Sequence, residues 1–371
     1  MLNKFWTIIS AYFLRPVQII RTYERSNLRS DLVAGLTIGV VAVPQAIAYA
    51  MIADLPPKYG LYAAVVTSII GALWGSSSHL STGPTNTTSL LVLASLVPVA
   101  VSGSEAYLLA AGLMAVMVGV FKMILGFARM GVLVNFVSDS VIIGFTTGAG
   151  VLIGANQMRH LLRLDIPSRA GLVDTLRDIS AHISETHWIS LILGVGVLII
   201  ISLLKRFAPK IPGPLLGMIV ATILVAAFRL DQAGVRVIDQ LPKSLPPFVN
   251  LPLFDLELIG QLSTGALAVG AISLVEAVAI SRSIASKSGE ILDSNQEFFG
   301  QGLANLVTGF FSGFPVSGSF TRSAANFSAG AKTSVSSRAV RKASYDQSSS
   351  AACRVIRSRC WPSRGTRSRL M

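Results

Sequence analysis

The sequence predicts an all-α polytopic membrane protein, and three observations support this fold class. Of the 371 residues, 52% are hydrophobic and only 13% are charged, whereas a soluble domain carries about 25% charged residues. Runs without Asp, Glu, Lys or Arg recur along the chain, and several approach the roughly 20 residues that a helix needs to cross a bilayer. Because no water hydrates the backbone inside a bilayer, helices are the simplest way to satisfy its polar groups.

Taken in order, the apolar runs predict nine or ten membrane segments. The runs are Leu32–Ala53, Tyr59–Ser78, Leu80–Ser104, Ala106–Phe121, Ser140–Met158, Trp188–Leu204, Ile211–Phe228, Leu258–Val275 and Phe298–Thr321. We expect the last run to form two segments, divided near residues 312–315. The polar connector 159–187 is expected to hold an amphipathic surface helix.

Two segments begin with polar residues, glycine and proline and therefore look broken. The third opens with Ser-Thr-Gly-Pro-Thr-Asn-Thr-Thr at 81–88, and the tenth opens with Pro-Val-Ser-Gly-Ser-Phe-Thr-Arg at 315–322. Such starts are typical of half-helices that begin inside the protein and line a binding site. The short repeat Gln-Ala-Ile-Ala at 45–48 and Glu-Ala-Val-Ala at 276–279 supports a site between two structural repeats.

The distribution of basic residues predicts a cytoplasmic N-terminal segment at 1–31. With that orientation, the inner segments hold twelve Lys and Arg residues, Lys122 among them, and the outer connectors hold eight. Cytoplasmic segments carry the excess of these residues. No cleavable signal peptide is evident at the start of the chain.

Glu276 lies deep in an apolar stretch of the eighth segment. A carboxylate at membrane depth is costly and usually faces a wet cavity or a partner. We therefore expect Glu276 to be an ion-coupling residue that takes up a proton near neutral pH. The alternatives are a structural partner of Arg282 or a polar contact between helices.

Arg322 lies near the start of the second half-helix, where free N–H groups and the helix dipole favour an anion. Its guanidinium would add a full positive charge to that site. The alternative is an interfacial arginine that reaches water. Hydroxyl groups such as those of Thr85, Ser319 and Thr321 could donate to the same anion, although Ser and Thr also serve as helix caps. Gln45 follows Pro44 in mid-membrane, so its amide could replace a lost backbone hydrogen bond or contact substrate.

Several function classes receive no support from the sequence. Both cysteines, Cys353 and Cys360, lie in the last 20 residues, and the four histidines are scattered, so neither a disulfide framework nor a metal site is predicted. The net charge is +13, of which +8 lies in residues 334–371, so nucleic-acid binding by the main body is not indicated. Phosphate-cradling and hydrolase motifs do not occur. We expect a protein that is not an enzyme and needs no cofactor.

Four stretches, in order and at family-like spacing over about residues 15–333, resemble the sulfate permease family of anion transporters and exchangers. They are Val-Pro-Gln-Ala-Ile-Ala-Tyr-Ala at 43–50, Leu-Pro-Pro-Lys-Tyr-Gly-Leu-Tyr at 55–62 with the following 75–84, Asp-Ser-Asn-Gln-Glu at 293–297, and Gly-Phe-Pro-Val-Ser-Gly-Ser-Phe-Thr-Arg-Ser at 313–323. Together these motifs are highly specific.

The resemblance implies fourteen membrane segments in two inverted seven-segment repeats, with a core domain that moves against a gate domain. It also implies an anion site where half-helices three and ten meet. Carried over by motif, this site comprises Gln45, Tyr49, Pro84, Thr85, Ser319, Phe320, Thr321 and Arg322, with Glu276 as the coupling residue. Implied partners are sulfate or bicarbonate, a coupling proton or sodium ion, the lipid bilayer of the cell (inner) membrane, and a second copy in a homodimer.

The chain departs from the family pattern after residue 333. A basic, Ser/Arg-rich stretch at 334–371 stands where segment eleven would begin. We therefore expect an incomplete transporter domain at 32–333, a tail that is not part of the fold, and a chain that does not transport on its own. For the family activity, the resemblance implies secondary active transport of a small inorganic anion, sulfate, coupled to protons, with the anion held between half-helices three and ten. The alternatives to this function are a sodium-coupled bicarbonate transporter, a nucleobase or other organic-anion carrier, a non-transporting truncated product and a membrane-embedded enzyme.

Overall fold

The computed structural model of the protein describes residues 14–23, 25–132, 139–166, 172–208, 213–235, 237, 244–329 and 331. Residues 1–13 of the predicted N-terminal segment and the whole predicted tail at 334–371 lie outside the described residues. The described helices are α2 (Arg15–Thr22), α3 (Leu28–Ile52), α4 (Pro57–Trp74), α5 (Asn86–Leu96), α6 (Glu105–Phe127), α7 (Asp139–Leu162), α8 (Leu172–Ala181), α9 (Trp188–Phe207), α10 (Gly213–Phe228), α11 (Leu256–Ser288), α12 (Ser294–Phe310) and α13 (Phe320–Ser328). Short 3-10 turns at Arg25–Asn27 and Ile183–Glu185 join some of them.

Each predicted apolar run corresponds to one helix, except that the last run forms two, α12 and α13, as expected. The connector at 159–187 contains the short helix α8. The apolar run of the eighth segment stops at Val275 because Glu276 follows it, but α11 includes Glu276 and continues for more than three turns to Ser288. Its ends are set by capping: Asp255 accepts from the Leu258 N–H, and Gly289 closes the helix with φ of 71°.

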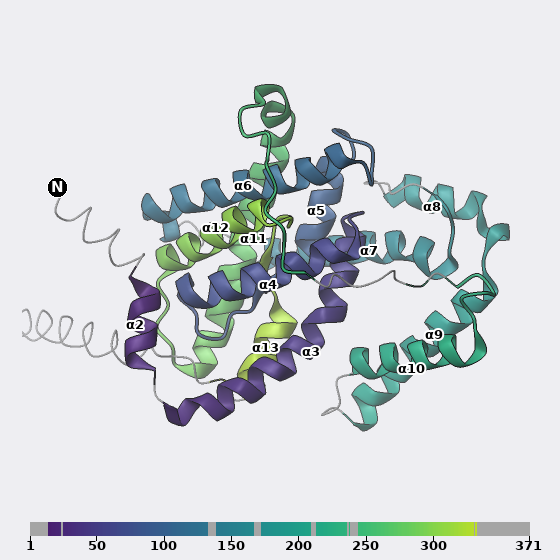
Figure 1. Cartoon of the computed structure of the whole chain (residues 1–371), viewed down its shortest axis with the longest axis horizontal. Coiled ribbons are helices and arrows are strands. Elements are labelled where there is room, and N and C mark those ends of the chain that lie inside the picture. Colours follow the sequence, from purple (N-terminus) through teal and green to yellow (C-terminus); the bar gives the residue numbers. More distant parts are fainter. Residues whose placement is uncertain are drawn as a thin grey trace, which may run out of the picture.

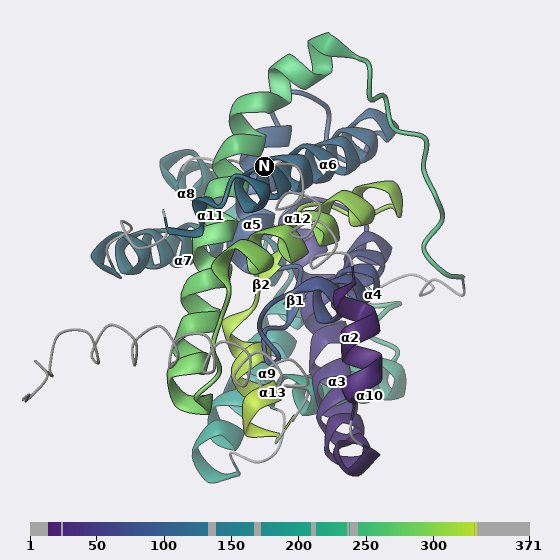
Figure 2. The same cartoon turned by 90° about the vertical axis from the view of Figure 1, so that its left-hand side faces the viewer.

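Helices from both halves of the sequence lie side by side (Figures 1 and 2), and glycines stand at their closest contacts. A Cβ atom on Gly302 of α12 would lie 2.8 Å from the Gly119 carbonyl oxygen of α6, and one on Gly300 would lie 2.7 Å from the Cα of Gly75. Glycine lets these backbones approach closely enough to pack in the absence of a strong hydrophobic driving force. The result is one body formed by α3–α6 and α11–α13.

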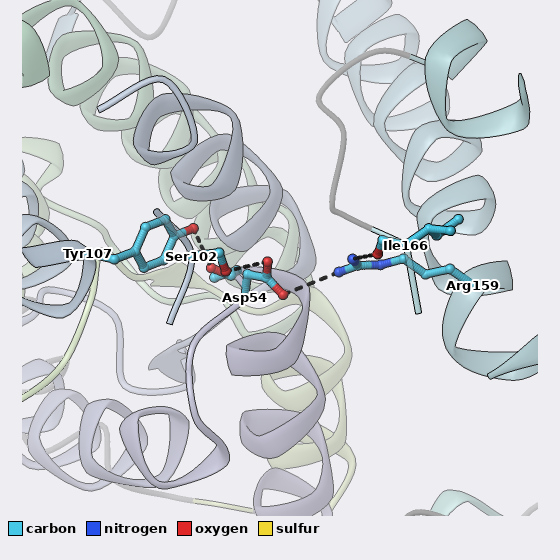
Figure 3. A network of polar contacts seen from close by, with 6 residues as sticks. Asp54, Ser102, Tyr107, Arg159 and Ile166 are labelled. Atoms are coloured by element: carbon cyan, nitrogen blue, oxygen red, sulfur yellow. Dashed lines mark hydrogen bonds and ion pairs between the residues drawn. The ribbon is translucent and has the colours of Figure 1, made fainter. Parts of the chain in front are cut away.

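Helices α7–α10 form a second group, on the right of Figure 1. An ion pair joins the two groups: Nη2 of Arg159, in the last turn of α7, lies 3.3 Å from Oδ1 of Asp54 at the end of α3. The Asp54 carboxylate also accepts from the Ser102 hydroxyl, and beside it the buried Tyr107 hydroxyl donates to the Ala53 carbonyl at 2.9 Å (Figure 3). The two helix groups are therefore linked by charge and hydrogen bonds at this point.

The outward surface of the described helices is strongly apolar. Leu36 on α3 is 64% exposed and Ile192 on α9 is 70% exposed, as expected where lipid replaces a protein core. By length and composition alone, α3, α6 and α11 could each cross a membrane, and α5, α9 and α10 contain shorter apolar helices. Among the described residues, fewer helices meet this length criterion than the nine or ten predicted segments, partly because α5 and α13 begin inside the protein and are short.

Lys122 is not a connector residue, contrary to the sequence-based interpretation. It lies within α6, which ends only at Phe127, and its side chain is 0% exposed. The apolar run stops at Phe121 only because a charge follows it. A residue buried inside a helix gives no information on membrane orientation. Arg159, counted among the outer basic residues, is likewise buried within α7, so the inner and outer counts each fall by one.

Candidate functional site

The two half-helices start from a two-stranded sheet at the centre of the molecule, near the labels β1 and β2 in Figure 2. Strand β1 (Thr82–Gly83) pairs antiparallel with β2 (Ser317–Gly318), with Thr82 opposite Gly318 and Gly83 opposite Ser317. Helices α5 and α13 begin within three residues of these strands. The prediction that two broken segments meet is therefore confirmed, and the N-termini of both half-helices start at one place.

Hydroxyl groups cap both half-helices. Oγ1 of Thr85 accepts from the Thr88 N–H at the start of α5, and Oγ of Ser319 accepts from the Arg322 N–H at the start of α13. Both caps have extended backbone dihedrals, as N-cap residues require. These two predicted site residues thus act first as caps, and Thr321 Oγ1 lies 3.3 Å from Ser319 Oγ.

Arg322 holds three separate parts of the chain together. Its Nη1 donates to the Pro84 carbonyl at 3.0 Å and to Oε1 of Gln45 at 3.3 Å, while Nε donates to the Ser81 hydroxyl at 3.3 Å. The side chain is only 3% exposed, so the alternative of an arginine that reaches water is wrong. Nη2 is buried and has no hydrogen-bond partner among the described residues.

Gly83 leaves room for this guanidinium. A Cβ atom at this position would lie 2.8 Å from Nη2 of Arg322, closer than real side chains approach. Gly318 on the other strand leaves room for different neighbours, because its Cβ would lie 2.7 Å from Cδ1 of Leu80 and 3.2 Å from the Cα of Ala277 in α11. At both positions a side chain would push neighbouring groups aside, so close approach rather than a special backbone conformation favours glycine in these strands.

Glu276 faces the same centre from α11. Its Oε1 accepts from the Thr87 hydroxyl at 3.4 Å, and Oε2 is buried without a partner among the described residues. Arg282 does not form an ion pair with it: the Arg282 side chain is exposed and donates to Ser294. The alternative that Glu276 is held by Arg282 is wrong.

The other predicted residues border this cluster. Tyr49, one turn after Gln45 on α3, is half-buried and packs against Leu90 and Leu93 of α5. Phe320 is 55% exposed and Thr321 is also exposed. Arg322 thus contacts both Gln45 and Pro84 directly, whereas the side chains of Phe320 and Thr321 are exposed at the edge of the cluster.

Sequence reasoning missed a polar layer behind the strands. Asn305 of α12 accepts from the Val316 N–H at 2.9 Å and donates to the Val316 carbonyl at 3.2 Å, and Lys122 Nζ donates to that same carbonyl at 3.2 Å. Gln301, one turn earlier, donates to Thr82 Oγ1 at 2.8 Å. The sequence signal for this layer is the pair of amide side chains, Gln301 and Asn305, four residues apart in an apolar helix. Because buried polar groups need partners, such a pair predicts a polar contact on that face of the helix.

The described residues contain no group of three His, Cys, Asp or Glu side chains that could hold a metal ion. The arrangement instead joins two half-helix N-termini, a buried guanidinium with a spare donor and a carboxylate with a spare oxygen. Helix N-termini and guanidinium groups are donors suited to oxyanions. The geometry therefore favours anion binding.

Comparison with known proteins agrees with this geometry. The model of the sulfate permease family matches residues 28–338. The chain belongs to the sulfate permease family. It is 37% identical over 326 residues to "Probable sulfate transporter 4.2" of Arabidopsis thaliana, covering 85% of this chain and 48% of that relative. It is 32% identical over 318 residues to a probable sulfate transporter of Mycobacterium tuberculosis, covering 86% and 56%.

Solved structures share the fold. The transmembrane domain of the cyanobacterial bicarbonate transporter BicA superposes with a TM-score of 0.74 at 24% identity, covering 85% of this chain and 80% of that one. Murine Slc26a9 in its inward-facing state gives 0.80 at 24% identity, covering 89% and 58%. The chain is therefore a multi-pass membrane protein of this transporter fold, and it spans about half the length of the curated relatives it matches.

Proposed function

We propose that this chain carries the anion-binding core of a secondary transporter, that sulfate is the anion, and that protons drive its uptake. The observation that carries the proposal is the buried Arg322 guanidinium, whose Nη2 lacks a partner among the described residues where α5 and α13 begin. A buried cation with an unused donor is costly unless a ligand satisfies it. An oxyanion would accept from Nη2 and benefit from both half-helix N-termini.

Relatives support the substrate class. Sulfate permease relatives at 32–37% identity are named as sulfate transporters, and sulfate offers several oxygen acceptors to converging donors. Bicarbonate coupled to sodium is the second candidate, because one structural neighbour is titled a bicarbonate transporter. The proposed site draws on residues of α3 and of the start of α5, and on residues at the start of α13: Gln45, Tyr49, Pro84, Thr85, Ser319, Phe320, Thr321 and Arg322.

The coupling role falls to Glu276. Its Oε2 is buried without a partner in the described part of the chain, so a proton on that oxygen would remove an unpaired charge from a poorly solvated position. The carboxylate also interacts electrostatically with Arg322. Binding of an anion to Arg322 removes part of that favourable interaction, so proton uptake and anion uptake are expected to reinforce each other.

Orientation, location and assembly belong to the same proposal. We place the chain in the cell membrane with a cytoplasmic N-terminus, on the basis of its basic residues and apolar helices. Association as a homodimer stays a prediction, which cross-linking in membranes would test.

Sulfate binding to the purified chain tests the proposed function. In detergent micelles, Arg322→Ala should weaken sulfate binding about tenfold or more, as removal of a charge-assisted hydrogen bond implies. Arg322→Lys should retain part of the affinity through its charge. Arg282→Ala, which removes an exposed arginine of α11, is the matched control and should bind like the unmodified chain. Equal affinities for all four proteins would contradict the proposal.

A further inference from the structure

Lys122 is a fully buried lysine that the proposed site does not use. It lies in α6 with 0% exposure, and its Nζ donates to the Val316 carbonyl at 3.2 Å. No carboxylate of the described residues forms an ion pair with this ammonium group. A buried cation needs a counter-charge close by, so the role of Lys122 depends on which nearby acidic group balances its charge.

One neighbouring charge is that of Glu276 on α11, the helix against which β2 packs. Val316 leads directly into β2, and the next residue, Ser317, donates to the Ser273 carbonyl of α11 at 2.8 Å. Gly318 then packs against α11, where a Cβ atom added to the glycine would lie only 3.2 Å from the Ala277 Cα. Two residues of extended chain thus separate the Lys122 contact from the helix that carries Glu276. The two charges interact electrostatically.

Lys122 also interacts electrostatically with Glu297, but other groups already neutralise the charge of that carboxylate. The Glu297 carboxylate accepts from the Ser76 and Ser77 N–H groups at 2.8 and 3.0 Å and from the Gln301 side chain at 3.2 Å. It also interacts electrostatically with Arg15. Three donors and a guanidinium therefore account for the charge of Glu297.

Charge balance at the site then involves three protein groups. Arg322 and Lys122 are basic groups that interact electrostatically with the acid Glu276. A bound anion favours the protonated form of both bases. With Glu276 protonated, the protein contributes two positive charges, which match one divalent anion. With Glu276 ionised, it contributes one, which matches a monovalent anion. Unbalanced charge in a poorly solvated site is costly.

We propose that Lys122 is a selectivity-determining residue, which makes the site accept a divalent anion together with one proton on Glu276. The inference rests on the proposed function and adds to it both a residue and a stoichiometry. A monovalent anion would bind with Glu276 ionised and would take up no proton. Without Lys122 the balance shifts by one charge, so the protonated site would match a monovalent anion instead.

Calorimetry on the purified 371-residue chain tests this assignment. Sodium sulfate and sodium nitrate are titrated at constant pH in two buffers of different ionisation enthalpy, which reports the protons taken up on binding. For the unmodified chain we expect about one proton per sulfate and none per nitrate. In Lys122→Met, sulfate binding should weaken about tenfold or more, and nitrate should now take up the proton.

Three further variants separate charge from packing. Lys122→Arg keeps the charge and should keep the sulfate preference, whereas Lys58→Met, which removes an exposed lysine of α4, should change nothing. Glu276→Gln should bind sulfate without proton uptake. If Lys122→Met unfolds, the other two variants still test the assignment of Lys122. Proton uptake that Glu276→Gln leaves unaltered contradicts the assignment. A folded Lys122→Arg protein that has lost its preference for sulfate contradicts it as well.

The outcomes distinguish this inference from the proposed function. If the unmodified chain binds neither anion, the proposed function fails, and the inference fails with it. If the unmodified chain binds sulfate and Lys122→Met shows the same preference and the same proton uptake, only the assignment of Lys122 is overturned.

Discussion

The ion pair between Asp54 and Arg159 offers a test of how the two helix groups are held together (Figure 3). The perturbation is Asp54→Asn, which removes the charge but keeps the shape. Asparagine suits this position because Asp54 has a φ of 58°, a conformation that asparagine tolerates better than most residues. The variant leaves Arg159 with its hydrogen bond to the Ile166 carbonyl at 3.1 Å.

The size of the effect follows from distance and burial. At 3.3 Å and an effective dielectric constant of about 20, the Coulomb energy is about 5 kcal/mol, much of which offsets desolvation. Breaking a buried pair costs about 3–5 kcal/mol. Because the Asp54 side chain is 24% exposed, against 7% for Arg159, we expect a loss of about 2 kcal/mol in the free energy of unfolding. Arg159→Met should cost less, about 1 kcal/mol, because the remaining Asp54 is hydrated.

A double-mutant cycle measures this interaction. Unfolding by sodium dodecyl sulfate in mixed micelles gives the free energy for each variant, and the double variant should be more stable than the sum of the single losses predicts. Asp174→Asn, on the exposed face of α8, is the matched control. A coupling energy within error of zero, or an Asp54→Asn loss no larger than the control, would refute the reasoning.

Two further predictions concern the site and its surroundings. Gly83→Ala places a Cβ 2.8 Å from Nη2 of Arg322, so the guanidinium must move and sulfate binding, measured by calorimetry, should weaken about tenfold. The control is Gly196→Ala in an open part of α9, which should leave the affinity unchanged. Equal affinities for the two variants would show that the guanidinium position is unimportant. Burial lowers the pKa of His79, in the connector after α4, below its ordinary value of 6.5, so the folded state favours the neutral ring and stability is lost as pH falls below about 6.5. Thermal unfolding at pH 5 and 7.5 should show this loss, reduced in His79→Asn, and an identical pH dependence in both proteins would contradict it.

The sequence predicted most of the fold because its signals are local. Apolar runs locate membrane helices, and the Gly, Pro and Thr residues at 81–88 and 315–322 mark where two of them break. Helix ends were less predictable, since α11 continues through Arg282 and Lys287, where a hydropathy pattern ends but helical hydrogen bonding does not.

The site was only partly predictable, for a different physical reason. Gln45 and Arg322 were named in advance, but their contact depends on how β1 and β2 pair, which no single segment encodes. The contacts of Lys122 and Asn305 were not predicted, because the partner of both side chains is the Val316 backbone carbonyl. A sequence displays side chains, whereas the buried carbonyl that each one meets is known only once the chain has folded.

The pairing of β1 with β2 also has a consequence for how the protein is made. Pro84 and Arg322, which meet in the finished site, are 238 residues apart. A ribosome that adds about 5–20 residues per second needs roughly 10–50 s to bridge that interval. Throughout this time the start of α5 exposes backbone groups that lipid cannot satisfy. We therefore expect the nascent first half to remain sheltered by the insertion machinery, and to be a target for proteolytic quality control if synthesis stalls before the second half arrives.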